Sequence, residues 1–223
     1  MSRPAADTAD TRERLIAAAL SVLSRGGIEH APVRQINRAA GVRHQSAVYY
    51  HFGDRWGLVE AVLDHATGEM LAEQDRRLRR IEAGEEAASV AAIFAAFVEP
   101  TLAIAAGETG RERLLFTARL LDEAGSRGQA LVAARVRPIA ARAERLLLGC
   151  LPGHDAVSVS ARMLYALNAL LHTLADRGMQ RHWGLGEVDK ARLVAELMAF
   201  LEGGLRHAPA PNTNEHDREQ PTP

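Results

Sequence analysis

The sequence predicts an all-α protein, and three observations support this fold class. Aromatic residues make up only 4% of the 223 residues, whereas alanine, leucine and arginine, which favour helices, are abundant. Apolar residues recur at intervals of three and four along most of the chain, as on one face of an amphipathic helix. No stretch shows the strict alternation of apolar and polar residues that a half-buried strand requires. A series of helices separated by glycine and proline is therefore expected.

The first helix is expected to begin at Asp10 or Thr11, because either side chain can cap a helix, and to end at Gly26 and Gly27. Residues 1–10 are small and polar and include a proline, so we expect a flexible arm there. The buried face of this helix is a single apolar stripe, made up of Leu15, Ile16, Ala19, Leu20, Val22 and Leu23.

Two short helices follow, and a tight turn joins them. The second helix starts at or next to Pro32, because proline suits the first helical turn, and Gly41 ends it. The third helix covers residues 46–51, and a long fourth helix runs from about 55 to 81. This order of elements predicts a helix-turn-helix domain over residues 11–57, joined by the fourth helix to the rest of the chain.

Five more helical patterns follow, separated by glycine or proline. Pro138 lies inside one of them and should kink or split that helix, since proline removes a backbone hydrogen bond and clashes with the preceding turn. The tail, residues 207–223, is rich in Pro, Asn, Thr and charge and should be disordered. The five patterns cover residues 87–106, 109–124, 127–149, 154–178 and 187–206.

Charge is distributed unevenly along the chain. Residues 11–57 contain seven arginines against three acidic residues, a net charge of +4, while the whole chain carries −1. A basic module on an acidic body is a mild indication of nucleic-acid binding, and a solvated arginine-rich surface is the alternative.

Several functional classes lack the residues they need. Cys150 is the only cysteine, which excludes an intramolecular disulfide and a multi-cysteine metal site, and its apolar neighbours predict a core position. The motifs of P-loop proteins, zinc peptidases and α/β-hydrolases are missing, so we expect no enzyme, no catalytic residues, no metal and no cofactor. The N-terminus has no signal-peptide pattern and no run of about 18 apolar residues occurs, so a cytoplasmic location without membrane contact is expected.

The segment from Gly41 to Leu58 carries the most specific signal. Tyr49, His51 and Phe52 stand in the order Y-x-H-F, followed by a basic residue and a leucine. This ordered string resembles the DNA-binding domain of the TetR (tetracycline-repressor-like) family. The subgroup with the segment G-x-R-x-x-S-A-x-x-Y-H-F-G matches it best.

The match has three departures from the commonest pattern of that family. The stretch from Gly41 to Tyr49 is one residue longer, which leaves open whether the recognition helix begins at position 43, 44 or 45. Pro32 stands where a Ser or Thr cap is common. Asn37 replaces a usual alanine, which predicts a partly buried polar side chain that needs a partner.

The resemblance implies DNA contacts from the second, third and fourth helices. Arg34 and Arg55 are expected at the DNA backbone, Tyr49 and His51 at phosphates, and Tyr50 at a base or a phosphate. Core packing is the alternative for the tyrosines and for the histidine, but adjacent tyrosines cannot share one helix face, so at least one should be exposed. The implied contact residues are Arg34, Arg43, His44, Gln45, Ser46, Tyr49, Tyr50, His51 and Arg55.

For residues 58–206 the resemblance implies a helical domain that binds an unidentified small-molecule effector and forms a homodimer. Possible pocket residues, each of which can equally be ordinary core, are Phe94, Phe97, Phe116, Met163, Asn168, His172 and Trp183. The last two helices should form the dimer interface through wide apolar stripes. These stripes consist of Leu164, Leu167, Leu170, Leu171 and Leu174 on one helix, and Leu193, Leu197, Phe200, Leu201 and Leu205 on the other.

The expected function is therefore a ligand-responsive repressor that binds a palindromic operator in double-stranded DNA as a dimer. Three alternatives remain open from the sequence: an activator of the same family, a helical ligand-binding protein without DNA binding, and an all-helical enzyme.

Overall fold

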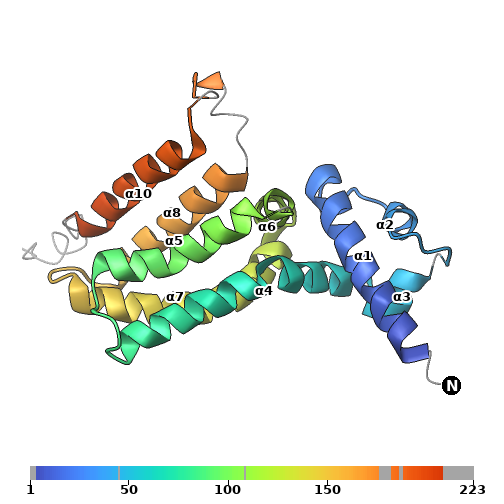
Figure 1. Cartoon of the computed structure of the whole chain (residues 1–223), viewed down its shortest axis with the longest axis horizontal. Helices are drawn as coiled ribbons and strands as arrows, with labels where there is room; N and C mark the ends of the chain where they lie inside the picture. The colour runs from blue at the N-terminus through green and yellow to red at the C-terminus, as the bar shows by residue number, and fades with distance from the viewer. Residues whose placement is uncertain (1–3, 45, 108, 176–181, 186–187, 208–223) are drawn as a thin grey trace, which may run out of the picture.

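The computed structural model describes residues 4–44, 46–107, 109–175, 182–185 and 188–207, and all regular secondary structure in these ranges is α-helical. Figure 1 shows two parts: α1, α2 and α3 gather at one end, and α4 runs from them into a bundle of the later helices. The predicted all-α fold, with an N-terminal helix-turn-helix joined by a long fourth helix to a C-terminal bundle, is confirmed.

The N-terminal part, called the head below, consists of α1 (Pro4–Gly26), α2 (Val33–Ala39) and α3 (Ala47–Phe52). The first helix begins at Pro4 and not at Asp10 or Thr11, so most of the expected arm is helical. Proline is well suited to the first position of a helix, and the alanines that follow favour its continuation.

The fourth helix, α4 (Arg55–Glu82), follows α3 after two residues, and a close backbone contact fixes this junction. Asp54 caps the helix, because its Oδ1 accepts a hydrogen bond of 2.7 Å from the backbone N–H of Gly57. A Cβ atom at Gly57 would collide with the carbonyl oxygen of Phe52, so only glycine lets the end of α3 approach α4 this closely.

The bundle consists of α5 (Val90–Ala106), α6 (Gly110–Glu123), α7 (Gly125–Cys150), α8 (Ala156–Ala175) and α10 (Lys190–Arg206), close to the predicted segments. Pro138 lies within α7 without splitting it, so that alternative was wrong. The proline is exposed, and water can satisfy the carbonyl group that loses its backbone partner. Cys150 is half-buried against the bundle core. The expected end of the eighth helix at 178 and the expected disorder of residues 208–223 fall outside the described residues.

Two hydrophobic clusters stabilise the molecule. The bundle cluster joins the last turns of α4 to α5, α6, α7, α8 and α10, with Leu114 and Ala118 contributed by α6. The head cluster contains the predicted stripe of α1 and the first half of α4, and it extends into the bundle through α6 and α7. The bundle residues that belong to the head cluster are Phe116, Leu120, Ala124 and Val132.

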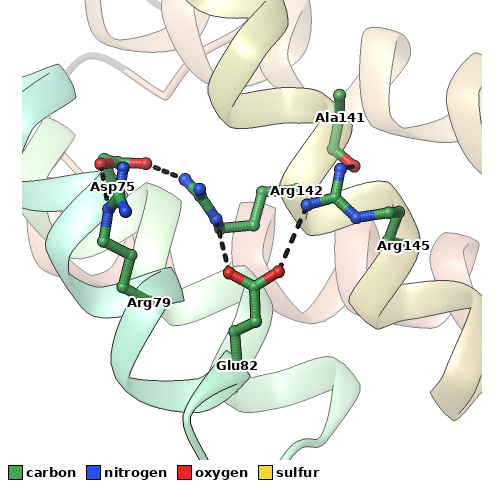
Figure 2. Close-up of polar contacts among 6 residues, drawn as sticks. All are labelled: Asp75, Arg79, Glu82, Ala141, Arg142 and Arg145. Atoms are coloured by element: carbon green, nitrogen blue, oxygen red, sulfur yellow. Dashed lines mark hydrogen bonds and ion pairs between the residues drawn. The ribbon is translucent and has the colours of Figure 1, made fainter.

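The far end of α4 is joined to α7 by a ladder of charged side chains (Figure 2). Arg142 lies between two carboxylates: its Nε donates to Glu82 at 2.9 Å, and its Nη1 donates to Asp75. Arg145 also donates to Glu82, at 3.2 Å, and Arg79 donates to Asp75 at 2.7 Å. The two arginines of α7 lower the pKa of the Glu82 carboxyl group, chiefly through the hydrogen bond from Arg142.

Within the described ranges, no single helix is both long and apolar enough to cross a membrane, although α5 and α6 together reach that length and composition across a sharp bend.

Candidate functional site

The helix-turn-helix is held from behind by apolar contacts. Ile36 on α2 and Val48 on α3 are fully buried, and both belong to the head cluster with α1 and α4. Gly41 adopts a positive φ of 67°, a conformation that other residues rarely reach, and so makes the tight turn between the helices. The backbone N–H of Val42 donates to the carbonyl of Asn37 at 2.9 Å. These contacts hold α3 in a fixed position on the surface of the head.

The outer face of α3 carries two exposed aromatic side chains. Tyr49 is 54% exposed and Tyr50 is 79% exposed, so neither tyrosine packs in the core. The inner face uses the small residues Ala47 and Val48, which lets α3 lie close to the helices behind it. The prediction that at least one tyrosine is exposed is confirmed, and the core alternative is wrong for both.

The structure also shows at which residue the third helix begins. The helix α3 starts at Ala47 with Ser46 at the N-cap position, so Arg43 and His44 lie in the turn before it. Both of these side chains are exposed, as are Ser46 and Arg34 at the start of α2. Gln45 lies outside the described residues.

The remaining predicted contact residues are more enclosed. His51 is half-buried, and its ring makes an edge-on contact with the ring of Tyr50 at 5.0 Å between centroids. The guanidinium group of Arg55 donates to the backbone carbonyl of Ala31 at 2.6 Å and to that of Ile28. Arg55 thus joins the start of α4 to the loop after α1. This structural role is an alternative, or an addition, to the predicted phosphate contact.

Two further residues of the head differ from expectation. Asn37 is 3% exposed, so this polar side chain is fully buried and not partly buried as predicted. Arg12, which the sequence did not single out, is exposed at the edge of α3, with its guanidinium carbon 5.2 Å from the centroid of the Phe52 ring. The local pattern gave no signal for it, because the contact depends on how α1 crosses α3.

A cavity of about 510 Å³ opens within the bundle, and α4, α5, α6, α7 and α8 all contribute to its lining. Aliphatic and aromatic residues form most of its wall. Polar groups interrupt that wall, above all the buried pair Gln74 and Thr101, whose side chains are joined by a hydrogen bond of 3.2 Å. A partly polar, mostly apolar cavity of this size suits a small organic molecule.

Only some of the residues predicted for a pocket lie at this cavity. Phe97 and Asn168 line it, whereas Phe94, Phe116 and Met163 are buried in the core away from it. His172 faces Asp122 at 3.9 Å, and the Trp183 side chain is largely exposed. Sequence reasoning missed Gln74 and Thr101. Gln74 continues the apolar stripe of α4 at helical spacing, and a polar residue on a buried stripe is the signal that could have found it.

Two acidic residues of α6 contact the head directly. Glu112 Oε1 accepts hydrogen bonds from Arg25 at 2.5 Å and from the Ser21 hydroxyl at 3.2 Å, both on α1. Glu123 Oε2 accepts one of 3.0 Å from the backbone N–H of Ile28, in the loop after α1. Since α6 also lines the cavity, one helix touches both the cavity and the head.

Comparison with known families agrees with this architecture. Residues 15–62 match the model described as "Bacterial regulatory proteins, tetR family", and residues 95–204 match "Tetracyclin repressor-like, C-terminal domain". The two matches cover the head with the start of α4, and most of the bundle.

The chain belongs to the TetR family.

Two curated relatives from Pseudomonas putida each match this TetR-family chain over a segment of 61 residues. The HTH-type transcriptional regulator SrpR is 43% identical over 61 residues, which are 27% of this chain and 28% of SrpR. The uncharacterized HTH-type transcriptional regulator TtgW is also 43% identical over 61 residues, which are 27% of this chain and 45% of TtgW. The matched segment therefore spans less than half of either relative.

The fold of the whole chain is similar to that of solved structures. The transcriptional regulator FadR from Bacillus subtilis, solved in complex with stearoyl-CoA, has a TM-score of 0.66 and covers 86% of this chain and 98% of its own. At 14% identity, this similarity shows a shared fold.

Proposed function

We propose that this TetR-family protein is a ligand-responsive transcriptional repressor that binds a palindromic DNA operator as a homodimer. The observation that carries the proposal is the placement of α3: its inner face is buried, and its outer face presents Tyr49 and Tyr50 to solvent. An exposed helix that is rigidly supported can enter the major groove of B-DNA, where base edges display a distinctive pattern of donors and acceptors.

The structure supports a division of labour among the proposed contact residues. Ser46, Tyr49 and Tyr50 lie on or beside the exposed face of α3, in position for base edges and nearby phosphates. Arg34 and Arg43 are exposed on either side and are assigned to the DNA backbone. His44, Gln45 and His51 remain proposed contacts. Arg55 is assigned first to holding the loop between α1 and α2.

The proposed dimer interface lies on α8 and α10. Leu164 and Phe200, which belong to the predicted stripes, are exposed, while Leu170, Leu174, Leu201 and Leu205 of the same stripes are buried in the bundle. Val157 and Tyr165 of α8 add to the exposed apolar surface. One face of each helix is thus buried within the chain and another is left for a partner. Light scattering after size-exclusion chromatography should give twice the chain mass of 24.2 kDa. Leu164→Glu should reduce it to the monomer value, whereas an unchanged dimer would contradict this surface.

The cavity is the proposed effector site, and FadR, which was solved with stearoyl-CoA, shows that a protein of this fold can bind a small molecule. An occupant would contact α6, which in turn contacts the head through Glu112 and Glu123. A ligand that prefers one arrangement of α6 would shift the population of head positions and lower the affinity for the operator.

DNA binding tests the proposal directly. Labelled DNA from upstream of the gene that encodes the chain is titrated with protein and followed by fluorescence anisotropy at two salt concentrations, with random DNA as the reference. We expect preferential binding that weakens steeply with salt, because protein cations displace counterions from phosphates. Tyr49→Ala should weaken it by about tenfold. Trp183→Ala, which removes another exposed aromatic side chain, should bind like the parent.

Two outcomes would change the proposal. Equal and weak binding to both DNAs, unaffected by Tyr49→Ala, would contradict specific DNA binding and leave a helical ligand-binding protein. A reporter driven by the bound promoter gives the sign of regulation: a fall in expression on adding the protein supports a repressor, and a rise would make it an activator.

A further inference from the structure

The polar groups in the buried part of the cavity share one property: their hydrogen-bond donors are already used. Each of three threonines in the wall donates its single hydroxyl proton to the backbone carbonyl one turn earlier in its own helix. Each hydroxyl therefore has only acceptor capacity left for an occupant, and the Thr101 oxygen already accepts one bond from Gln74 and lies 3.5 Å from the Met70 sulfur. The donor and acceptor pairs are Thr67 with Leu63 at 2.8 Å, Thr101 with Phe97 at 2.8 Å, and Thr117 with Arg113 at 2.9 Å.

Gln74 extends this pattern and is the least ambiguous case. Its amide nitrogen donates one proton to the carbonyl of Phe97 at 3.0 Å and the other to the Thr101 oxygen at 3.2 Å. A backbone carbonyl is an acceptor only, so the amide cannot be turned the other way round. The carbonyl oxygen of Gln74 is therefore the polar atom that this buried side chain can offer to an occupant of the cavity.

Negative charge on an occupant would find little compensation in this wall. Arg135 lines the cavity, and two of its three guanidinium nitrogens are engaged within the protein: its Nε donates to the Asp64 carboxylate at 2.6 Å, which offsets its charge, and its Nη1 donates to the carbonyl of Leu131 at 3.0 Å. Asp122, also in the lining, would repel an anion. Asn168 and Gln129 each donate one amide proton to a carbonyl of the protein and lie toward the exposed part of the cavity.

We propose that the cavity selects an uncharged, largely apolar molecule that carries at least one O–H or N–H group. This inference rests on the proposed role of the cavity as the effector site, and it names the chemical class of the effector. The apolar wall contributes affinity through burial of the hydrocarbon surface, and the acceptors of Gln74 and the threonines select for a donor. A molecule whose polar groups are acceptors only leaves these oxygens without partners, which costs binding free energy.

Three fluorescent probes with one skeleton test the inference. N-phenyl-1-naphthylamine is uncharged and has one N–H donor. Its N-methyl derivative lacks the donor, and 8-anilinonaphthalene-1-sulfonate adds a negative charge. All three brighten in apolar surroundings, so each can be titrated with the full chain in the absence of DNA. The N–H probe should bind tightest, and the N-methyl probe should bind about twofold to tenfold more weakly. The sulfonate should also bind more weakly than the N–H probe.

A substitution of Gln74 tests whether this residue causes the preference for the N–H probe. Gln74→Leu removes the acceptor at similar size and should bring the N–H and N-methyl probes to nearly equal affinity. Gln35→Leu, at an exposed position of α2, should leave the preference unchanged. The comparison of the three probes on the parent protein does not depend on the folding of either variant.

Three results would overturn the inference: no binding of the N–H probe, equal binding of the N-methyl probe to the parent protein, or tightest binding of the sulfonate. Because no DNA is present, these results leave the anisotropy experiment unaffected. A protein that binds its operator but shows no preference among the probes would refute the effector class alone. A protein that prefers the N–H probe but does not bind DNA specifically would refute the repressor proposal alone.

Discussion

The two ends of α4 are buried in different apolar clusters, and the far end adds a ladder of ion pairs to α7. At its start, Leu58, Val59, Val62 and Leu63 are almost completely buried in the head cluster. At its far end, Asp75 and Glu82 join α7 through the charged ladder of Figure 2, and most of those side chains remain in contact with solvent. The first half of α4 cannot separate from the head without exposing apolar surface, which costs about 25 cal/mol for each Å². At the far end, Leu78 and Ile81 are likewise buried, in the bundle cluster, and the partly exposed ion pairs of the ladder add little to that apolar contact.

This difference indicates where the molecule can move. The cavity lies beside the middle of α4, between the part packed in the head cluster and the part packed in the bundle cluster. We expect the head and the first half of α4 to move together relative to the bundle, with α6, which packs in both clusters, between the two parts. Three substitutions test this comparison, one at each kind of contact.

The largest effect is expected from Phe116→Ala. Phe116 belongs to α6 of the bundle but is fully buried in the head cluster, so its truncation should lower the free energy of unfolding by about 3–5 kcal/mol. Urea unfolding followed by Trp56 fluorescence, in a Trp183→Phe background, reports on the head. Arg111→Ala, at an exposed position of the same helix, should leave the transition in place. An unchanged Trp56 transition in Phe116→Ala would show that the head folds without α6.

A smaller effect is expected from Arg55→Lys. The substitution keeps the positive charge but loses the planar fork that binds the carbonyls of Ala31 and Ile28, so stability should fall by about 1–2 kcal/mol. The same unfolding experiment measures it, and Arg34→Lys on the exposed face of α2 is the matched control. If both lysine variants were as stable as the parent, the anchoring role of Arg55 would be refuted.

The smallest effect is expected at the ladder, from Glu82→Gln. Arg142 and Arg145 lower the pKa of Glu82, so its carboxylate stabilises the fold above the ordinary value of 4.5, and this stabilisation disappears as the pH falls through the lowered pKa. The variant should therefore melt slightly below the parent at neutral pH, and the difference should vanish in acid. Melting temperatures between pH 7 and pH 3 measure this, with Glu86→Gln as an exposed control. A difference in melting temperature that persisted in acid would contradict the proposed stabilisation by the Glu82 carboxylate.

The helix-turn-helix could be predicted in detail because its signals are local. All of these signals lie within one short segment: the glycine at the turn, the small apolar residues and the Y-x-H-F order. Each one reflects the conformation of its own backbone or a contact with a residue close by in the sequence. The helices of the bundle were also placed within a few residues, since glycine and helical period mark them. The start of α1 was missed because alanine and proline suit both an arm and a first helical turn.

Residue roles that depend on distant partners were harder to predict. An arginine at the start of α4 suits a phosphate and a backbone carbonyl equally well, and only the path of the loop after α1 shows that carbonyls lie within reach of Arg55. The residues that line the cavity were hard to predict for the same reason. Large aromatic residues were natural candidates, but Phe94 and Phe116 fill the core, and the polar pair Gln74 and Thr101 from two helices came together only in the folded chain.

The extension of the head cluster into α6 limits the modularity of this TetR-family protein. The boundary that the sequence predicts near residue 58 separates the two proposed roles, DNA binding and effector binding. The buried surface does not end there, because Phe116, Leu120, Ala124 and Val132 complete the core under the helix-turn-helix. A chimera that carried only the first four helices onto a foreign sensor would lose this apolar support. Grafting the proposed operator specificity of this protein onto another scaffold thus requires α6 and the first turns of α7 to be transferred as well, or their inner surfaces to be redesigned.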